Sequence, residues 1–145
     1  MQPALSPTPR YTYPEYLKLE EQSDVRHEWF AGEIFAMAGG SGAHAVLKTN
    51  LTRMVGVALL GKPCQPRDAD QRVVIPETGL ATYPDLSIVG GPRIPHPDDR
   101  HALTNPTVLF EVLSPGSASY DAGAKFDQYK ELTTLRQYVL IDSER

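Results

Sequence analysis

The segment Thr107-Val108-Leu109-Phe110-Glu111-Val112-Leu113 decides the fold, because it has the composition of a strand at the centre of a β-sheet. Its side chains are apolar on both faces of the pleat except at Glu111, and the turn residues Ser114-Pro115-Gly116-Ser117 end it. An isolated ionised carboxylate in a protein interior costs several kcal/mol, so buried carboxylates are usually paired with a cation or bound to a metal. Glu111 is therefore the first candidate functional residue.

A second carboxylate lies in Tyr83-Pro84-Asp85-Leu86-Ser87-Ile88-Val89, where Asp85 opens a short apolar strand. If this strand neighbours that of Glu111, the two carboxylates can converge on one face. Carboxylate oxygens, with a backbone carbonyl and waters, suit Mg²⁺, and a metal held there could activate water for phosphodiester cleavage. The alternative is that Asp85 caps a turn and Glu111 makes a buried salt bridge. On spacing alone this alternative is favoured.

Lys125 bears on this choice because it lies on a helical stretch that follows the strand of Glu111. A stripe at helical spacing borders the apolar face: Asp121, Lys125, Tyr129 and Leu132. Lys125 is therefore expected at the edge of the core, where its ammonium could reach a scissile phosphate or orient the attacking water. The alternative is an i,i+4 ion pair with Asp121, which stabilises a helix by about 0.2–0.5 kcal/mol. Taken alone, the ion pair is the favoured interpretation.

The remaining patterns predict an α/β (α+β mixed) fold. Apolar runs between turn signals predict strands at 34–37, 71–75, 83–89, 107–113 and 137–141. Helices are expected at 12–22, with a capping box of Thr12 and Glu15, at 43–60, and after Ser117, where Ala122, Phe126, Tyr129 and Leu132 or Thr133 would face the core. Loops are expected at 39–42, 76–79 and 92–106. The order of these elements predicts a mixed central β-sheet flanked by helices, with a β-α-β crossover at the C-terminal end.

Composition places the chain among ordinary globular proteins. Its 145 residues and 16.0 kDa predict a single domain at 12–145 behind a flexible lead at 1–11. The net charge of −4 gives no general attraction to nucleic acid, so DNA binding would require a local basic surface. The single cysteine, Cys64, excludes an internal disulfide, and no membrane span or signal peptide is evident. A cytoplasmic location is the expectation.

Several segments together closely resemble the Uma-two family, a large bacterial group of restriction-endonuclease-like proteins in the PD-(D/E)xK nuclease superfamily. The resemblance rests on Gly32-Glu33-Ile34, Tyr83-Pro84-Asp85-Leu86-Ser87-Ile88-Val89, Phe110-Glu111-Val112-Leu113-Ser114-Pro115, Asp121, Lys125, Tyr129 and Tyr138-Val139-Leu140-Ile141-Asp142. It runs from about Thr12 to the C-terminus and implies a central mixed sheet between helices, with the acids on adjacent strands. Family members usually continue past the last of these strands, which predicts that this chain lacks C-terminal strands of the family.

By position, the resemblance makes Asp85 and Glu111 metal-binding acids, joined by the backbone carbonyl of Val112. The usual lysine position of the superfamily, two residues after the glutamate, is Leu113 in this chain. The resemblance therefore implies that the lysine has moved to the following helix, where Lys125 stands.

The resemblance also draws in residues outside these motifs. Glu28 matches a glutamate before the family's glycine-glutamate turn and would be an accessory acid near the metal, although His27 precedes it where the family often has tyrosine. The helix at 43–60 has an apolar face: His44, Leu47, Leu51, Met54, Val55 and Ala58. The family often has histidine at His44, for which a satisfied core or helix-terminal role is favoured. Exposed arginines usually have no special role, but four could supply phosphate contacts: Arg67, Arg72, Arg93 and Arg100.

The sequence thus predicts a Mg²⁺-dependent DNA endonuclease, with Mn²⁺ as a substitute, that hydrolyses phosphodiester bonds by metal-activated water. Asp85, Glu111 and the Val112 carbonyl would hold the metal. Lys125 would stabilise charge or position water, and Glu28 would assist. DNA is the expected partner, and cleavage of both strands makes a homodimer attractive. The alternative is a non-catalytic nucleic-acid-binding or partner-binding protein that retains the nuclease fold.

Overall fold

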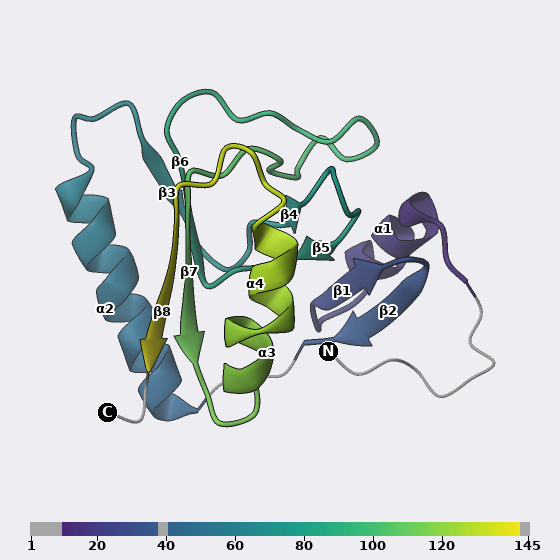
Figure 1. Ribbon diagram of the computed structural model, residues 1–145, viewed down its shortest axis with the longest axis horizontal. Coiled ribbons are helices and arrows are strands. Elements are labelled where there is room, and N and C mark those ends of the chain that lie inside the picture. Colours follow the sequence, from purple (N-terminus) through teal and green to yellow (C-terminus); the bar gives the residue numbers. More distant parts are fainter. Residues whose placement is uncertain (1–9, 38–40, 143–145) are drawn as a thin grey trace.

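The computed structural model describes residues 10–37 and 41–142 (Figure 1). This part of the chain forms two four-stranded sheets with helices packed around them, so the predicted mixed α and β class is confirmed, although the strands divide between two sheets. Parts of two predictions lie outside the described residues: positions 1–9 of the expected lead and positions 39–40 of the expected loop at 39–42.

The first sheet is antiparallel and has the strand order β2-β1-β5-β4. Its strands are β1 (His27–Phe30), β2 (Glu33–Ala36), β4 (Val73–Val74) and β5 (Ala81–Thr82). The turn between β1 and β2 has positive φ at Ala31 (52°) and at Gly32 (86°), as a tight type I′ hairpin requires. The turn was predicted, whereas β1 was not, because two polar residues open it and no apolar alternation marks it.

The second sheet carries the strands of both candidate acids and has the order β3-β6-β7-β8. Strands β3 (Gln65–Arg67), β6 (Leu86–Val89) and β7 (Val108–Leu113) pair antiparallel, and β8 (Gln137–Asp142) runs parallel to β7. The strand of Glu111 is therefore central, as predicted. A parallel pair needs a crossover connection, which is formed here by α3 (Ala118–Ala122) and α4 (Ala124–Tyr129).

The two longer helices begin within one residue of their predicted starts at 12 and 43. α1 (Tyr13–Glu21) has the predicted capping box: the Thr12 hydroxyl accepts a hydrogen bond from the Glu15 amide, and the Glu15 carboxylate accepts one from the Thr12 amide. α2 (Gly42–Ala58) begins at Ser41, whose hydroxyl caps it. In Figure 1, α2 lies to the left of the second sheet and α4 to its right.

The apolar face predicted for α2 is only partly correct. Half-buried side chains follow the predicted stripe at His44, Leu47, Leu51 and Val55, but Met54 is 66% exposed and Ala58 is also exposed. The helix contacts β3 and β7, while several of its other apolar side chains, including Met54, are exposed.

The helix predicted after Ser117 is interrupted at Gly123, which separates α3 from α4. Tyr129 and Leu132 are buried as predicted, whereas Ala122 and Phe126 are exposed and their predicted core positions were wrong. The buried face instead carries Asp121, Lys125 and Tyr129. A rule based on apolar residues selects the wrong face here because charged side chains are buried.

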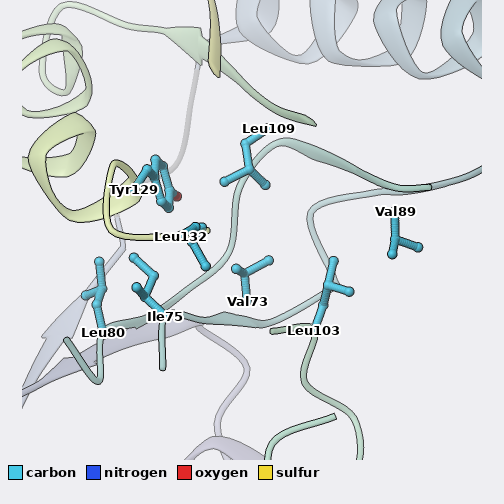
Figure 2. Close-up of a cluster of buried hydrophobic side chains, with 8 residues drawn as sticks. All are labelled: Val73, Ile75, Leu80, Val89, Leu103, Leu109, Tyr129 and Leu132. Atoms are coloured by element: carbon cyan, nitrogen blue, oxygen red, sulfur yellow. The ribbon is translucent and has the colours of Figure 1, made fainter. Parts of the chain in front are cut away.

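The main apolar core lies between the two sheets and α4, as Figure 2 shows. Its buried members are Val73, Ile75, Leu80, Val89, Leu103, Leu109, Tyr129 and Leu132. Leu103 belongs to the segment 92–106, which was predicted to be a surface loop and in fact sends this fully buried side chain into the core. The same segment is fixed by an ion pair of Arg72 with Asp99, with nitrogen–oxygen distances of 2.6 and 3.0 Å.

Candidate functional site

Asp85 and Glu111 lie on neighbouring strands. In the register of β6 with β7, Leu86 pairs with Phe110, so continuing the register by one residue places Asp85 opposite Glu111. The Asp85 carboxylate accepts a hydrogen bond from the Val112 amide at 2.7 Å, which fixes it beside β7. Glu111 is 5% exposed, in agreement with its position in a central strand.

Lys125 projects from α4 into a group of buried carboxylates and is itself only 3% exposed. Its Nζ lies 3.8 Å from Glu111 Oε1, 3.9 Å from Glu28 Oε2 and 3.7 Å from Asp121 Oδ1. The i,i+4 pair with Asp121 is therefore present, but it is one of three contacts. Lys125 joins the strand of Glu111 to the first sheet, which supplies Glu28.

Two tyrosines complete the buried polar group. The Tyr120 hydroxyl donates to Glu28 Oε2 at 3.0 Å, and the Tyr129 hydroxyl donates to Glu111 Oε1 at 3.4 Å. Tyr129 also belongs to the apolar core, so the position of Glu111 is tied to the packing of the domain.

The electrostatics of this group favour a neutral Glu111. The pKa of Glu111 is raised to about 8: burial is the largest cause, Lys125 opposes it, and the charges of Asp85, Asp121 and Glu28 add to it. The pKa of Asp121 is also raised, mainly by burial.

Lys125 behaves in the opposite way. Burial acts to lower the pKa of Lys125, but the surrounding carboxylates outweigh it and the net shift is upward. Lys125 is therefore a cation at neutral pH, and the group carries more acid than this one lysine neutralises.

A second set of contacts holds Asp85 from α2. Lys48 Nζ lies 3.4 Å from Asp85 Oδ1, and His44 Nε2 lies 3.6 Å from Asp85 Oδ2. The same His44 nitrogen donates to the Val112 carbonyl at 2.7 Å. His44 is thus satisfied, as predicted, but its partners are two candidate site residues.

Lys48 was missed by the sequence analysis. It stands four residues after His44 and therefore on the same face of the helix, and this spacing was the available signal. Nothing in the sequence shows that this face of α2 meets Asp85.

The donor set of Asp85, Glu111 and the Val112 carbonyl consists of oxygens only, which fits Mg²⁺. Within residues 10–37 and 41–142, no three His, Cys, Asp or Glu side chains gather into a metal site by themselves. The fit therefore depends on two carboxylates supplemented by a carbonyl. The raised pKa of Glu111 reflects burial and an excess of nearby carboxylates, so a cation bound at this site would be electrostatically favourable.

Of the four arginines considered for phosphate contacts, at least two serve the fold. Arg72 pairs with Asp99, and Arg93 donates to the carbonyls of Arg100 and Ala102. Both hold the segment 92–106 in place.

Acids on neighbouring strands of a mixed sheet, beside a lysine from the adjoining helix, define a restriction-endonuclease-like protein. The family model Uma2 (Uma-two), described as "Putative restriction endonuclease", matches residues 13–145. The chain belongs to this family. The match begins one residue after the predicted domain start at Thr12.

The chain is also similar to individual proteins. A solved structure from Anabaena variabilis, described as a putative nuclease belonging to DUF820, superposes with a TM-score of 0.70 at 19% identity over 88% of this chain and 72% of that one, which shows the shared fold. Two uncharacterised proteins of Synechocystis are 36% and 34% identical, over 95% and 90% of this chain and 72% and 74% of their own lengths. Among the helices that the structure describes, none has the length and apolar character needed to cross a membrane.

Proposed function

We propose that this protein is a metal-dependent DNA endonuclease. The observation that carries the proposal is the position of Asp85 opposite Glu111 on the adjacent strand, with the buried Lys125 ammonium 3.8 Å from the Glu111 carboxylate. Membership of a restriction-endonuclease-like family supports it.

Asp85, Glu111 and the Val112 carbonyl are the groups we assign to Mg²⁺, with Mn²⁺ as a substitute. Such a metal, when bound, supplies an activated water and stabilises negative charge on the phosphate. Asp85 is held for this task by the Val112 amide at 2.7 Å. Glu111 is protonated at neutral pH without metal, because its pKa is about 8, and added positive charge beside it would favour release of that proton.

Lys125 contributes a fixed positive charge. Its raised pKa keeps the ammonium protonated at neutral pH, so it can stabilise a developing phosphate charge or orient the attacking water but is a poor general base. Glu28 is the accessory acid in this proposal. It holds Lys125 from the first sheet and is itself held by Tyr120.

The alternative proposal is a DNA-binding or partner-binding protein that keeps the fold without cleavage. One observation favours it: three carboxylates already surround Lys125 at 3.7 to 3.9 Å, as they would in a purely structural network.

Nicking of supercoiled plasmid DNA distinguishes the two. Wild-type protein should nick or linearise plasmid with Mg²⁺ or Mn²⁺ and not with EDTA. Glu111→Gln, Asp85→Asn and Lys125→Ala should each reduce the rate by about 100-fold or more, whereas Glu77→Gln, at an exposed turn position, should cut normally.

A folded wild-type protein that binds DNA but never cuts it would select the binding function. Linear product formed without accumulation of nicked circles, together with a dimer mass in solution, would support the homodimer that the sequence led us to expect.

A further inference from the structure

A groove of about 520 Å³ opens beside Asp85, between α2 and the segment that precedes β4. It is lined by Arg26, Lys48, Thr49, Thr52, Arg53, Asp68, Ala69, Asp70 and Asp85. Glu111 and Lys125 are buried and do not line it. Asp85 is therefore where the groove meets the candidate active site.

The cations of this groove differ in how far they are already neutralised. Arg26 pairs with Asp70 at 2.8 Å, and Lys48 pairs with Asp85 at the longer distance of 3.4 Å. Arg53 has no ion pair within the described part of the chain and makes only a long contact, 3.4 Å, with Asn50. Arg53 and, more weakly, Lys48 thus remain available to an anion.

The hydroxyls in the groove are not available as donors. Thr49 donates to the carbonyl of Ala45, and Thr52 donates to that of Lys48. The three cations of the lining are matched by three carboxylates, so an anion lying there would be held locally by Arg53 and Lys48 rather than by hydroxyl hydrogen bonds. Lysine and arginine are common contacts to the phosphates of a nucleic-acid backbone.

We propose that this groove holds the backbone of the DNA strand being cut, with Lys48 beside the phosphate at Asp85 and Arg53 on a phosphate farther along. The proposal rests on the proposed function, since Asp85 marks where that function places the scissile phosphate. Lys48 and Arg53 are separated by about 7.5 Å along the axis of α2. The phosphates of one strand repeat every 3.4 Å or so along the duplex axis, so two cations this far apart can contact different phosphates.

A larger neighbouring groove, of about 1000 Å³, shares Arg26 and Asp70 with the first. Its lining is more acidic, with four further carboxylates at Glu20, Glu21, Asp98 and Asp99. We therefore expect the row of phosphates bound in the first groove to end near Arg26. Arg100 provides a matched control because it is exposed like Arg53 but lines only the second groove.

The test is the binding of a short labelled DNA duplex in EDTA, measured by fluorescence anisotropy at several salt concentrations. Arg53→Ala and Lys48→Met should each weaken binding by about 10-fold and reduce the slope of log K against log salt by about 0.9. Lys48→Arg should restore most of the binding, and Arg100→Ala should match wild type. Thermal melts establish that each variant is folded, and Arg53→Ala, which breaks no ion pair, stays informative even if Lys48→Met disturbs Asp85.

Two failures are distinguishable. If wild type binds and nicks DNA but Arg53→Ala and Lys48→Met both bind as Arg100→Ala does, with an unchanged salt slope, the groove proposal is overturned and the proposed function stands. If wild type neither binds nor cuts DNA, both are overturned.

Discussion

Replacing Glu111 with glutamine should stabilise the metal-free protein. The amide keeps the shape of the side chain and can still accept from Tyr129, and Lys125 keeps Glu28 and Asp121 as partners. Neither Tyr129 nor Lys125 is then left without a partner. The substitution removes a carboxyl group whose ionised form the folded state disfavours, because its pKa rises from 4.5 to about 8.

The magnitude follows from that shift. A raised carboxyl pKa means that the folded state binds the proton more tightly, so its stabilising contribution is full below about pH 4.5 and is lost as pH rises to about 8. Above about pH 4.5, this contribution to the free energy of unfolding falls by about 1.4 kcal/mol for each pH unit. At about pH 7.5, ionisation of Glu111 therefore disfavours the folded state by up to about 4 kcal/mol. Allowing for the weakened contact with Lys125, we expect Glu111→Gln to gain about 1–3 kcal/mol, or about 2–10 °C in Tm.

Lys125→Met provides the contrast. It removes the only cation within 4.0 Å of Glu28, Glu111 and Asp121 among the described residues. We expect a loss of about 3–5 kcal/mol near neutral pH, since the buried carboxylates are left without a counter-charge. The loss should shrink in acid as they protonate.

The assay is urea unfolding of wild type, Glu111→Gln and Lys125→Met in EDTA across the range from about pH 4.5 to 8. Wild type should lose stability as pH rises through this window, and Glu111→Gln should show a smaller pH slope. A loss of about 3–5 kcal/mol in Glu111→Gln itself would refute the reasoning, because it would make Glu111 one half of a structural ion pair.

Three other outcomes are expected. Saturating Mg²⁺ should stabilise wild type by about 2.7 kcal/mol at 100 times Kd and leave Asp85→Asn nearly unmoved, in thermal melts with and without EDTA; equal responses would remove Asp85 from the metal site. Arg72→Met should cost about 3–5 kcal/mol at neutral pH by leaving Asp99 buried without its partner. Although burial acts to raise the pKa of Asp99, the hydrogen bonds from Arg72 and Tyr13 lower it overall, so this loss should fade as pH falls below about 4, and a pH-independent loss would contradict it. Thr12→Ala should cost about 1 kcal/mol by removing the cap of α1, as measured by urea unfolding, and no change would mean that the cap is redundant.

The sequence predicted most accurately the features that depend on residues within one strand or one helix. The apolar neighbours of Glu111 indicated a buried central strand, and the capping box fixed the start of α1 to the residue. The strands β3 and β5 were not predicted, because three and two residues are too few to show the alternation of apolar and polar residues that marks a strand.

The site was harder to predict because its contacts join distant segments. Lys125 meets Glu28 from β1, and Asp85 meets Lys48 from α2. No local pattern encodes such contacts. Phe126 shows the reverse error: an apolar residue at helical spacing was assigned to the core, yet it lies at the surface, stacked on Tyr138, because charged residues occupy the buried face of α4.

The central claim is that Asp85, Glu111 and the Val112 carbonyl hold a divalent metal. The most direct measurement is anomalous diffraction from crystals of the protein grown with Mn²⁺. We predict one strong peak at about 2.1–2.2 Å from an oxygen of each of the three groups, and loss of that peak in Asp85→Asn. Well-ordered Mn²⁺-soaked crystals with no peak there, or with the two carboxylates more than about 8 Å apart, a separation that bonds of about 2.1 Å cannot bridge, would contradict the account.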